Sequence, residues 1–163
     1  MDTWNAMKGF SLIELVMVIV LISILAVFAM PLWTGSTINI AAQADQLAAD
    51  ILYTQSLSLT SGQRYYLIEI TASTYQIRNS AGTAITYPGT GKTTITLNSG
   101  ITFGSFTNLP NNLVAFDGQG IPYTTSTTPG TALATAGQMP LTASGTTTKT
   151  IFITPGTGMV YIQ

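Results

Sequence analysis

The stretch K-G-F-S-L-I-E, residues Lys8 to Glu14, opens an apolar run that continues to Met30 and is interrupted only by Ser11, Glu14 and Ser23. About 20 apolar residues wound as a helix match the roughly 30 Å hydrocarbon core of a bilayer. The sequence therefore predicts a transmembrane helix over residues 10–30 that anchors the chain.

Glu14 is the one charged residue within this predicted span. A carboxylate at the centre of a membrane helix costs about 2.5–3.5 kcal/mol on insertion scales, and an ionisable residue in a span points to a functional site. A cationic partner would offset that cost. The alternative is that the charge is merely tolerated, because a carboxylate in the first helical turn gains up to about 1 kcal/mol from the helix dipole.

The run from Gly9 to Glu14, with a basic residue before it and the apolar stretch after it, resembles the class III signal of type IV pilins and pseudopilins. The resemblance implies that residues 1–9 are a leader, that a prepilin peptidase cuts between Gly9 and Phe10, and that the new amine of Phe10 is methylated. It also implies that Glu14 pairs with the Phe10 amine of a neighbouring subunit during filament assembly. Residues four apart share one helix face, so amine and carboxylate have matching positions.

Ordinary secretion is the second interpretation of the same run. The segment Val27-Phe28-Ala29 has small residues where a signal peptidase could cut, and Lys8 would supply the basic n-region. However, the apolar run is longer than the usual h-region of about 7–15 residues, and Glu14 would have no role within it. The chain has no cysteine, which excludes a lipoprotein anchor and disulfides.

Composition predicts one small globular head behind the anchor in this 163-residue chain. Only 7% of the residues are charged, the formal net charge is −1, and histidine is absent. Nothing in this balance attracts polyanions strongly. Lys8 on the short N-terminal side predicts a cytoplasmic N-terminus by the positive-inside rule. The resemblance places the anchor in a bacterial inner membrane and the head in the periplasm.

An amphipathic helical segment is expected over residues 31–62. Pro31 and Gly35 interrupt the helical propensity, and a helical pattern resumes from Ile38 to Ser61, with Gly62 as its C′ stop. The resemblance implies that the helix can kink at Pro31 on assembly, and a simple juxtamembrane kink is the alternative. The expected buried stripe consists of Ala41, Ala44, Ala48, Ile51, Leu52 and Leu59.

Residues 63–163 change to threonine, glycine and β-branched residues, which predicts an antiparallel β-rich head. The last two strands should form a hairpin around residues 155–158, and Pro129–Gly145 should be a surface loop. The fold class predicted is α+β, with the helix stripe packed on the sheet. The expected strands are Arg64–Ile70, Thr74–Arg78, Thr93–Leu97, Ile101–Phe103, Leu113–Phe116, Lys149–Thr154 and Met159–Ile162.

Within the pilin class, the body resembles the group of minor pseudopilin H and FimT-like proteins. The resemblance rests on segment 47–51 running into the 62–64 turn, on the 116–120 turn and on the two closing strands. Some FimT-like members bind DNA through a C-terminal arginine motif, but residues 154–163 contain no arginine or lysine. Major pseudopilins hold calcium, yet after Glu69 the only acid is Asp117, so we expect no calcium site.

No enzyme site is predicted. Residues 87–94 (Y-P-G-T-G-K-T-T) resemble part of a phosphate-binding loop, but Thr86 stands where its first glycine belongs and a strand pattern follows. Without histidine or cysteine the chain lacks an imidazole base and a thiolate nucleophile. Asp45 and Asp50 lie about 140° apart around the helix, so we interpret them as a solvated face. Tyr65 and Tyr66 should point to opposite sheet faces, one to the core and one to solvent.

The sequence thus predicts a structural subunit, a minor pilin or pseudopilin of a type IV pilus or a type II secretion pseudopilus, without catalytic residues, cofactor or metal. The expected partners are prepilin peptidase, other pilin or pseudopilin subunits, an inner-membrane assembly platform and the membrane itself. Binding of nucleic acid is not expected. The alternative from another class is a FimT-like DNA-uptake receptor or a filament-tip adhesin that makes contact through Pro129–Gly145.

Overall fold

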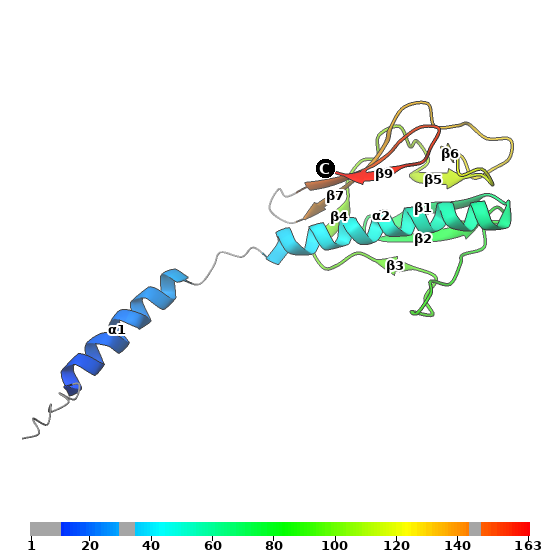
Figure 1. Cartoon of the computed structure of the whole chain (residues 1–163). Coiled ribbons are helices and arrows are strands. Elements are labelled where there is room, and N and C mark those ends of the chain that lie inside the picture. Colours follow the sequence, from blue (N-terminus) through cyan, green and yellow to red (C-terminus); the bar gives the residue numbers. More distant parts are fainter. Residues whose placement is uncertain (1–10, 30–34, 144–147) are drawn as a thin grey trace, which may run out of the picture. The chain divides into compact units, whose positions relative to one another are not determined.

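The computed structural model describes residues 11–29, 35–143 and 148–163. The chain separates into two compact units, Met1–Trp33 and Thr34–Gln163. The first unit holds the helix α1, and the second holds the helix α2 and the strands β1 to β9 (Figure 1). Most of the helical segment expected over residues 31–62, from Thr34 onward, therefore belongs to the same compact unit as the β-rich head.

The helix α1 (Leu12–Ala29) lies inside the apolar run. This stretch contains neither glycine nor proline, so nothing interrupts its backbone hydrogen bonds. Where its side chains are described, from Leu12 to Ile24, they are exposed. Within the described parts of the chain, no helix combines the length and the hydropathy needed to cross a membrane.

The helix α2 (Gly35–Ser61) ends where the sequence predicts. Gly62 has a φ of 67°, and its N–H donates to the carbonyl oxygen of Ser58 at 2.9 Å. This left-handed C′ position favours glycine because other residues are strained there. The helix begins at Gly35, three residues before the predicted start.

The predicted buried stripe of α2 is wrong in part. Leu52 and Leu59 are 46% and 51% exposed, and Ala41 is only half-buried. The buried side chains still follow the helical spacing of three and four residues, but several of them are polar. They are Ile40, Gln43, Ala44, Leu47, Ile51, Thr54 and Ser58.

The polar members of this buried face have hydrogen-bond partners. Thr54 Oγ1 donates to the carbonyl oxygen of Asp50 at 2.7 Å, and Gln43 Oε1 accepts from the backbone N–H of Asn98 at 2.9 Å. Ser58 Oγ accepts from the N–H of Tyr65 at 3.1 Å. A buried polar group is inexpensive once it is hydrogen-bonded, which is why apolarity alone did not identify this face.

The strands described form two antiparallel sheets instead of one. The first has the order β3-β2-β1-β5-β6 and the second the order β4-β7-β8-β9. The first sheet consists of β1 (Tyr65–Thr71), β2 (Thr74–Asn79), β3 (Ile95–Thr96), β5 (Leu113–Phe116) and β6 (Pro122–Tyr123). The second consists of β4 (Ile101–Phe103), β7 (Gly137–Ala143), β8 (Thr148–Ile153) and β9 (Val160–Ile162).

The strand β7 corrects the prediction of a surface loop over Pro129–Gly145. β7 lies between β4 and β8, and its Met139 and Leu141 are fully buried. Its burial alternates residue by residue, as expected for a strand with one face on the core. The expected hairpin is confirmed, because β8 pairs with β9 across residues 154–159.

The main core lies between α2 and the inner faces of both sheets, with Leu47, Leu67 and Ile151 among its fully buried members. Tyr65 packs against this core, while Tyr66 is 6% exposed in a smaller cluster with Leu113 on the other face of the sheet. The two tyrosines do point to opposite faces, but neither is a surface residue. The α+β fold class is confirmed.

Candidate functional site

The N-terminus of α1 has a defined cap. Ser11 precedes the first helical residue, and its Oγ and carbonyl oxygen accept from the N–H of Glu14 at 3.3 Å and 3.0 Å. Serine at the N-cap with glutamate three residues later is the pattern of a capping box. Glu14 therefore sits in the first turn, where the helix dipole favours a negative charge.

The sides of α1 are apolar and uncovered within the isolated unit. Leu12 is 81% exposed, Met17 is 67% exposed, and Ile24 at the other end of the described side chains is 52% exposed. Ser23 donates its hydroxyl to the carbonyl oxygen of Ile19 at 2.7 Å, so its polar group is satisfied by its own helix. A helix that is apolar on all sides requires lipid or protein around it.

The other predicted site residues lie outside the described part of the chain. Gly9 and Phe10, at the predicted cleavage bond, and Pro31, at the predicted kink, are in this group. The structure therefore places only Glu14 of the four, and it brings no partner charge to that carboxylate among the residues described.

In the second unit, the end of α2 is tied to two turns by one side chain. Gln55 Nε2 donates to the carbonyl oxygens of Gly120 at 2.9 Å and Thr157 at 3.0 Å. Gly120 follows β5 and Thr157 lies between β8 and β9, so Gln55 links the helix to both sheets. A Cβ on Gly118 would approach the carbonyl oxygen of Gly62 to 2.8 Å, which shows how closely the turn after β5 packs against the end of α2.

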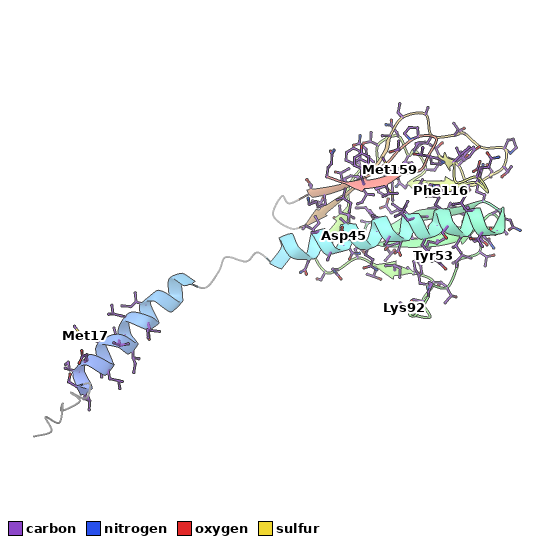
Figure 2. The ribbon with its side chains drawn as sticks, in the orientation of Figure 1. Met17, Asp45, Tyr53, Lys92, Phe116 and Met159 are labelled. Carbon is purple, nitrogen blue, oxygen red and sulfur yellow. The ribbon has the colours of Figure 1, made fainter. Side chains whose placement is uncertain are left out.

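Asp50 is partly buried against the first sheet, which corrects its prediction as part of a solvated face. Tyr75 Oη donates to Asp50 Oδ2 at 2.6 Å. Burial raises the pKa of Asp50, and the bond from Tyr75 opposes that rise. Tyr87 is 5% exposed, and its hydroxyl finds no hydrogen-bond partner among the residues that the structure describes. Asp45, labelled on α2 in Figure 2, is exposed as predicted.

Arg64 holds a second polar cluster just after α2. Its side chain is 7% exposed, its guanidinium carbon lies 4.0 Å from the ring centroid of Tyr123, and Nη1 donates to the carbonyl oxygen of Thr127. A Cβ on Gly130 would approach Arg64 Nη1 to 2.5 Å, so glycine allows the loop to close over the arginine. Arg64 thus stabilises this loop by cation–π and hydrogen-bond contacts.

The acidic side chains of the described residues are not clustered as in a metal site. The described part of the chain contains no group of three or more His, Cys, Asp or Glu side chains placed to hold a metal ion. Asp117 Oδ1 accepts from the N–H groups of Gln119 and Ile121, both at 2.9 Å, and so stabilises the turn that follows β5. The segment that resembles a phosphate-binding loop is followed by the strand β3 and not by a helix.

Sequence reasoning missed Gln55 and Arg64 as organising residues. Gln55 lies outside the predicted buried stripe of the helix, although its hydrogen bonds reach residues 65 and 102 positions away in the sequence. Arg64 carried only the weak signal of a charged residue next to the helix stop. Contacts over such sequence distances leave no local pattern, because periodicity reports only which face of an element is buried.

Comparison with known proteins gives one sequence match. Residues 4–30 match the family described as the prokaryotic N-terminal methylation motif. The matched segment includes Ser11 and Glu14 of the capping box and the whole of α1. No curated protein sequence matches the chain.

Solved structures share the fold. The type IV minor pilin FimU of Pseudomonas aeruginosa, in two crystal forms, aligns with TM-scores of 0.54 and 0.52 at 12% identity, over 76% of this chain and 87% and 91% of FimU. The minor pseudopilin EpsH from the type 2 secretion system of Vibrio cholerae aligns with a TM-score of 0.51 at 12% identity, over 77% of this chain and 96% of EpsH. The motif and the fold together support the type IV pilin and pseudopilin superfamily.

Proposed function

We propose that this chain is a minor pilin or pseudopilin, a non-enzymatic structural subunit of a type IV pilus or of a type II secretion pseudopilus. One observation carries the proposal: a prokaryotic N-terminal methylation motif over residues 4–30 is joined to a head with the fold of minor pilins. In this proposal a prepilin peptidase removes residues 1–9 and methylates the amine of Phe10. Residues 10–30 then anchor the subunit in the inner membrane, with the head in the periplasm.

Assembly in this proposal depends on the charge of Glu14. The capping box accounts for a polar residue at this position, but a glutamine would serve the cap equally well. Only a carboxylate can pair with the methylated amine of Phe10 in a neighbouring subunit, and the pairing would relieve the cost of a charge among apolar side chains. The other subunits and the inner-membrane assembly platform are the expected partners, and Pro31 is proposed to allow bending of the chain on assembly.

Two substitutions of Glu14 separate its role in the helix cap from the role of its charge. Glu14→Ala removes both the cap partner and the charge, whereas Glu14→Gln keeps the cap pattern and removes the charge. Both variants should be absent from sheared filament fractions while accumulating in membranes like the parent chain. If Glu14→Gln assembles as well as the parent, the charge has no role and the pairing proposal is wrong.

A DNA-uptake receptor or a filament-tip adhesin is not favoured by any observation on the head. Among its four basic side chains, Arg64 is buried over Tyr123 and is unavailable to phosphate. The segment proposed as an adhesive loop contains β7, whose Met139 faces the core. We therefore put forward the structural role alone.

A further inference from the structure

The strand β9 forms one edge of the second sheet, and the backbone groups on its outer side have no partner among the described residues. Its Tyr161 pairs with Phe152, and the N–H groups of Gln163 and Thr150 donate to each other's carbonyl oxygens at 2.9 Å. In an antiparallel ladder, hydrogen-bonded residues alternate along the strand. Tyr161 and Gln163 therefore bond to β8, while Val160 and Ile162 point their N–H and C=O groups away from it.

The other sheet edges in the described residues are blunted or occupied. β6 begins with Pro122, and its Tyr123 bridges to Ala132. On β4, the N–H of Phe103 donates to the carbonyl oxygen of Ala72 at 2.7 Å, and β3 is only two residues long. Proline, cover and shortness are the usual protections of an edge strand. β9 is also short, but it has no proline, no charge and no hydrogen-bonded cover among the described residues, so its edge is the least protected of the four.

We propose that β9 pairs antiparallel with β9 of a second copy of this chain, about a two-fold axis at Tyr161. In this register, Val160 exchanges two hydrogen bonds with Ile162 of the second copy, and Ile162 does the same with Val160 of that copy. The outward-pointing groups match this pattern without any shift. A second copy presents the same charges, and like charges opposite each other destabilise a pair. Because β9 carries no charged side chain, pairing with a second copy places no like charges opposite each other.

The outer face of β9 adds an aromatic contact to this pairing. The rings of Phe152 and Tyr161 are stacked, with centroids 5.0 Å apart and planes 6° apart. Tyr161 is 39% exposed, and Met159, labelled just before β9 in Figure 2, is 58% exposed. In the proposed register the two Tyr161 residues form the non-hydrogen-bonded pair, with Cα atoms about 4.5 Å apart. The stacked pairs of both copies would then join into one aromatic row.

The pairing has a consequence for assembly, which rests on the proposed function. Figure 1 shows α2 running alongside β9 in the head, and the two elements are in contact. A two-fold axis across β9 reverses the direction of the strand and therefore of α2. A filament built from parallel N-terminal helices cannot contain two heads arranged in this way. The dimer is thus a state of unassembled subunits, and its formation competes with entry into the filament.

The absence of cysteine from the chain allows a direct test on the full chain in detergent. Disulfides need Cα atoms about 4.4–6.8 Å apart, and the proposed Tyr161 pair meets that range at about 4.5 Å. Tyr161→Cys should give a disulfide-linked dimer under mild oxidation. Thr102→Cys, which places a thiol on an exposed residue of β4, is the matched control and should give at least tenfold less. Equal crosslinking of the two variants would overturn the proposal.

A second pair of variants tests the hydrogen bonds of the edge. Added to Tyr161→Cys, Val160→Pro removes an outward N–H that β8 does not use, and proline is tolerated on an edge strand in that orientation. Val160→Ala loses side-chain volume but keeps the N–H. We expect at least a tenfold loss of dimer with Val160→Pro and near-parent dimer with Val160→Ala. Equal dimer from both would contradict backbone pairing.

The effect on assembly separates this inference from the proposed function. Cells making the Tyr161→Cys chain should show it in filament fractions only when the disulfide is reduced. If the oxidised dimer enters filaments as readily as the reduced chain, the competition is wrong although the subunit role stands. If the reduced and parent chains never enter filaments, the proposed function fails, while the crosslinking result remains a separate fact about β9.

Discussion

Replacing Met139 by alanine tests whether β7 is a core strand. The side chain is fully buried, and β7 is hydrogen-bonded to β4 on one side and β8 on the other. A strand held on both sides cannot easily collapse into the space left by the missing atoms. Methionine-to-alanine changes in cores cost about 2–5 kcal/mol, so we expect Met139→Ala to lower the free energy of unfolding by about 3 kcal/mol. For a unit of this size that loss lowers Tm by about 10 °C.

Thermal unfolding of the full chain, followed by near-ultraviolet circular dichroism, measures this loss. All seven tyrosines lie in the second unit, so the tyrosine part of the signal reports the head, whereas the two tryptophans lie in the first unit and are the same in every variant compared. Gln138→Ala is the control, because Gln138 is the half-buried neighbour on the opposite face of β7. Its free energy should change by no more than about 0.5 kcal/mol, as is usual for surface positions. Equal and small changes in both variants would mean that residues 137–143 are a surface loop after all.

Three further changes test the site and the turns around it. Glu14→Ala should reduce the chain in sheared filament fractions to background, measured by immunoblot against the membrane pool. Asp50→Asn should raise Tm at pH 7, because burial raises the pKa of Asp50 and disfavours its charge. This gain should shrink as pH falls toward 3.8, the ordinary pKa of an aspartate, since the folded parent takes up the proton before the unfolded chain does. Gly158→Ala should lower Tm more than Gly156→Ala, since both have positive φ but only a Cβ on Gly158 would meet other atoms, with Phe116 at 2.8 Å.

Each of these changes has an outcome that would contradict its reasoning. Normal amounts of Glu14→Ala in filaments would remove the assembly role of the carboxylate. An Asp50→Asn variant that is less stable by the same amount at pH 4 and pH 7 would mean that the hydrogen bond from Tyr75 outweighs burial. Equal losses for the two glycine variants would mean that φ alone matters and that the turn at Gly158 is not tightly packed.

The features that could be predicted from the sequence depend on local patterns. The apolar run, the stop at Gly62 and the strands over residues 101–103 and 113–116 all follow from residues next to each other in the chain. Their signals are a long apolar stretch, a glycine directly after the last helical residue, and short apolar or β-branched runs bounded by glycine, asparagine and proline. The resemblance over residues 8–14 likewise rests on a contiguous motif, and the match over residues 4–30 supports it.

The features that were missed depend on tertiary contacts. The segment that contains β7 was predicted as a surface loop because residues 129–145 contain few large apolar side chains. Its Pro140 also lacks the N–H group that a strand ladder uses. In the structure, the carbonyl oxygen of Pro140 accepts from the N–H of Gly104 at 2.8 Å, one residue past the end of β4. Because proline has no N–H, the pairing between β4 and β7 loses one backbone hydrogen bond, and that position lies at the end of the paired segment. The buried face of α2 was misplaced because Thr54 and Ser58 are polar but hydrogen-bonded.

The central claim is that the chain is processed as a prepilin, and the intact mass of the membrane-extracted protein tests it most directly. The chain should be expressed together with a prepilin peptidase and measured beside the same chain made without the enzyme. The account predicts a mass that begins at Phe10 and carries one added methyl group, and the uncut mass without the peptidase. A mass beginning at Met30 would show ordinary secretion and would contradict both the anchor and the assembly role of Glu14.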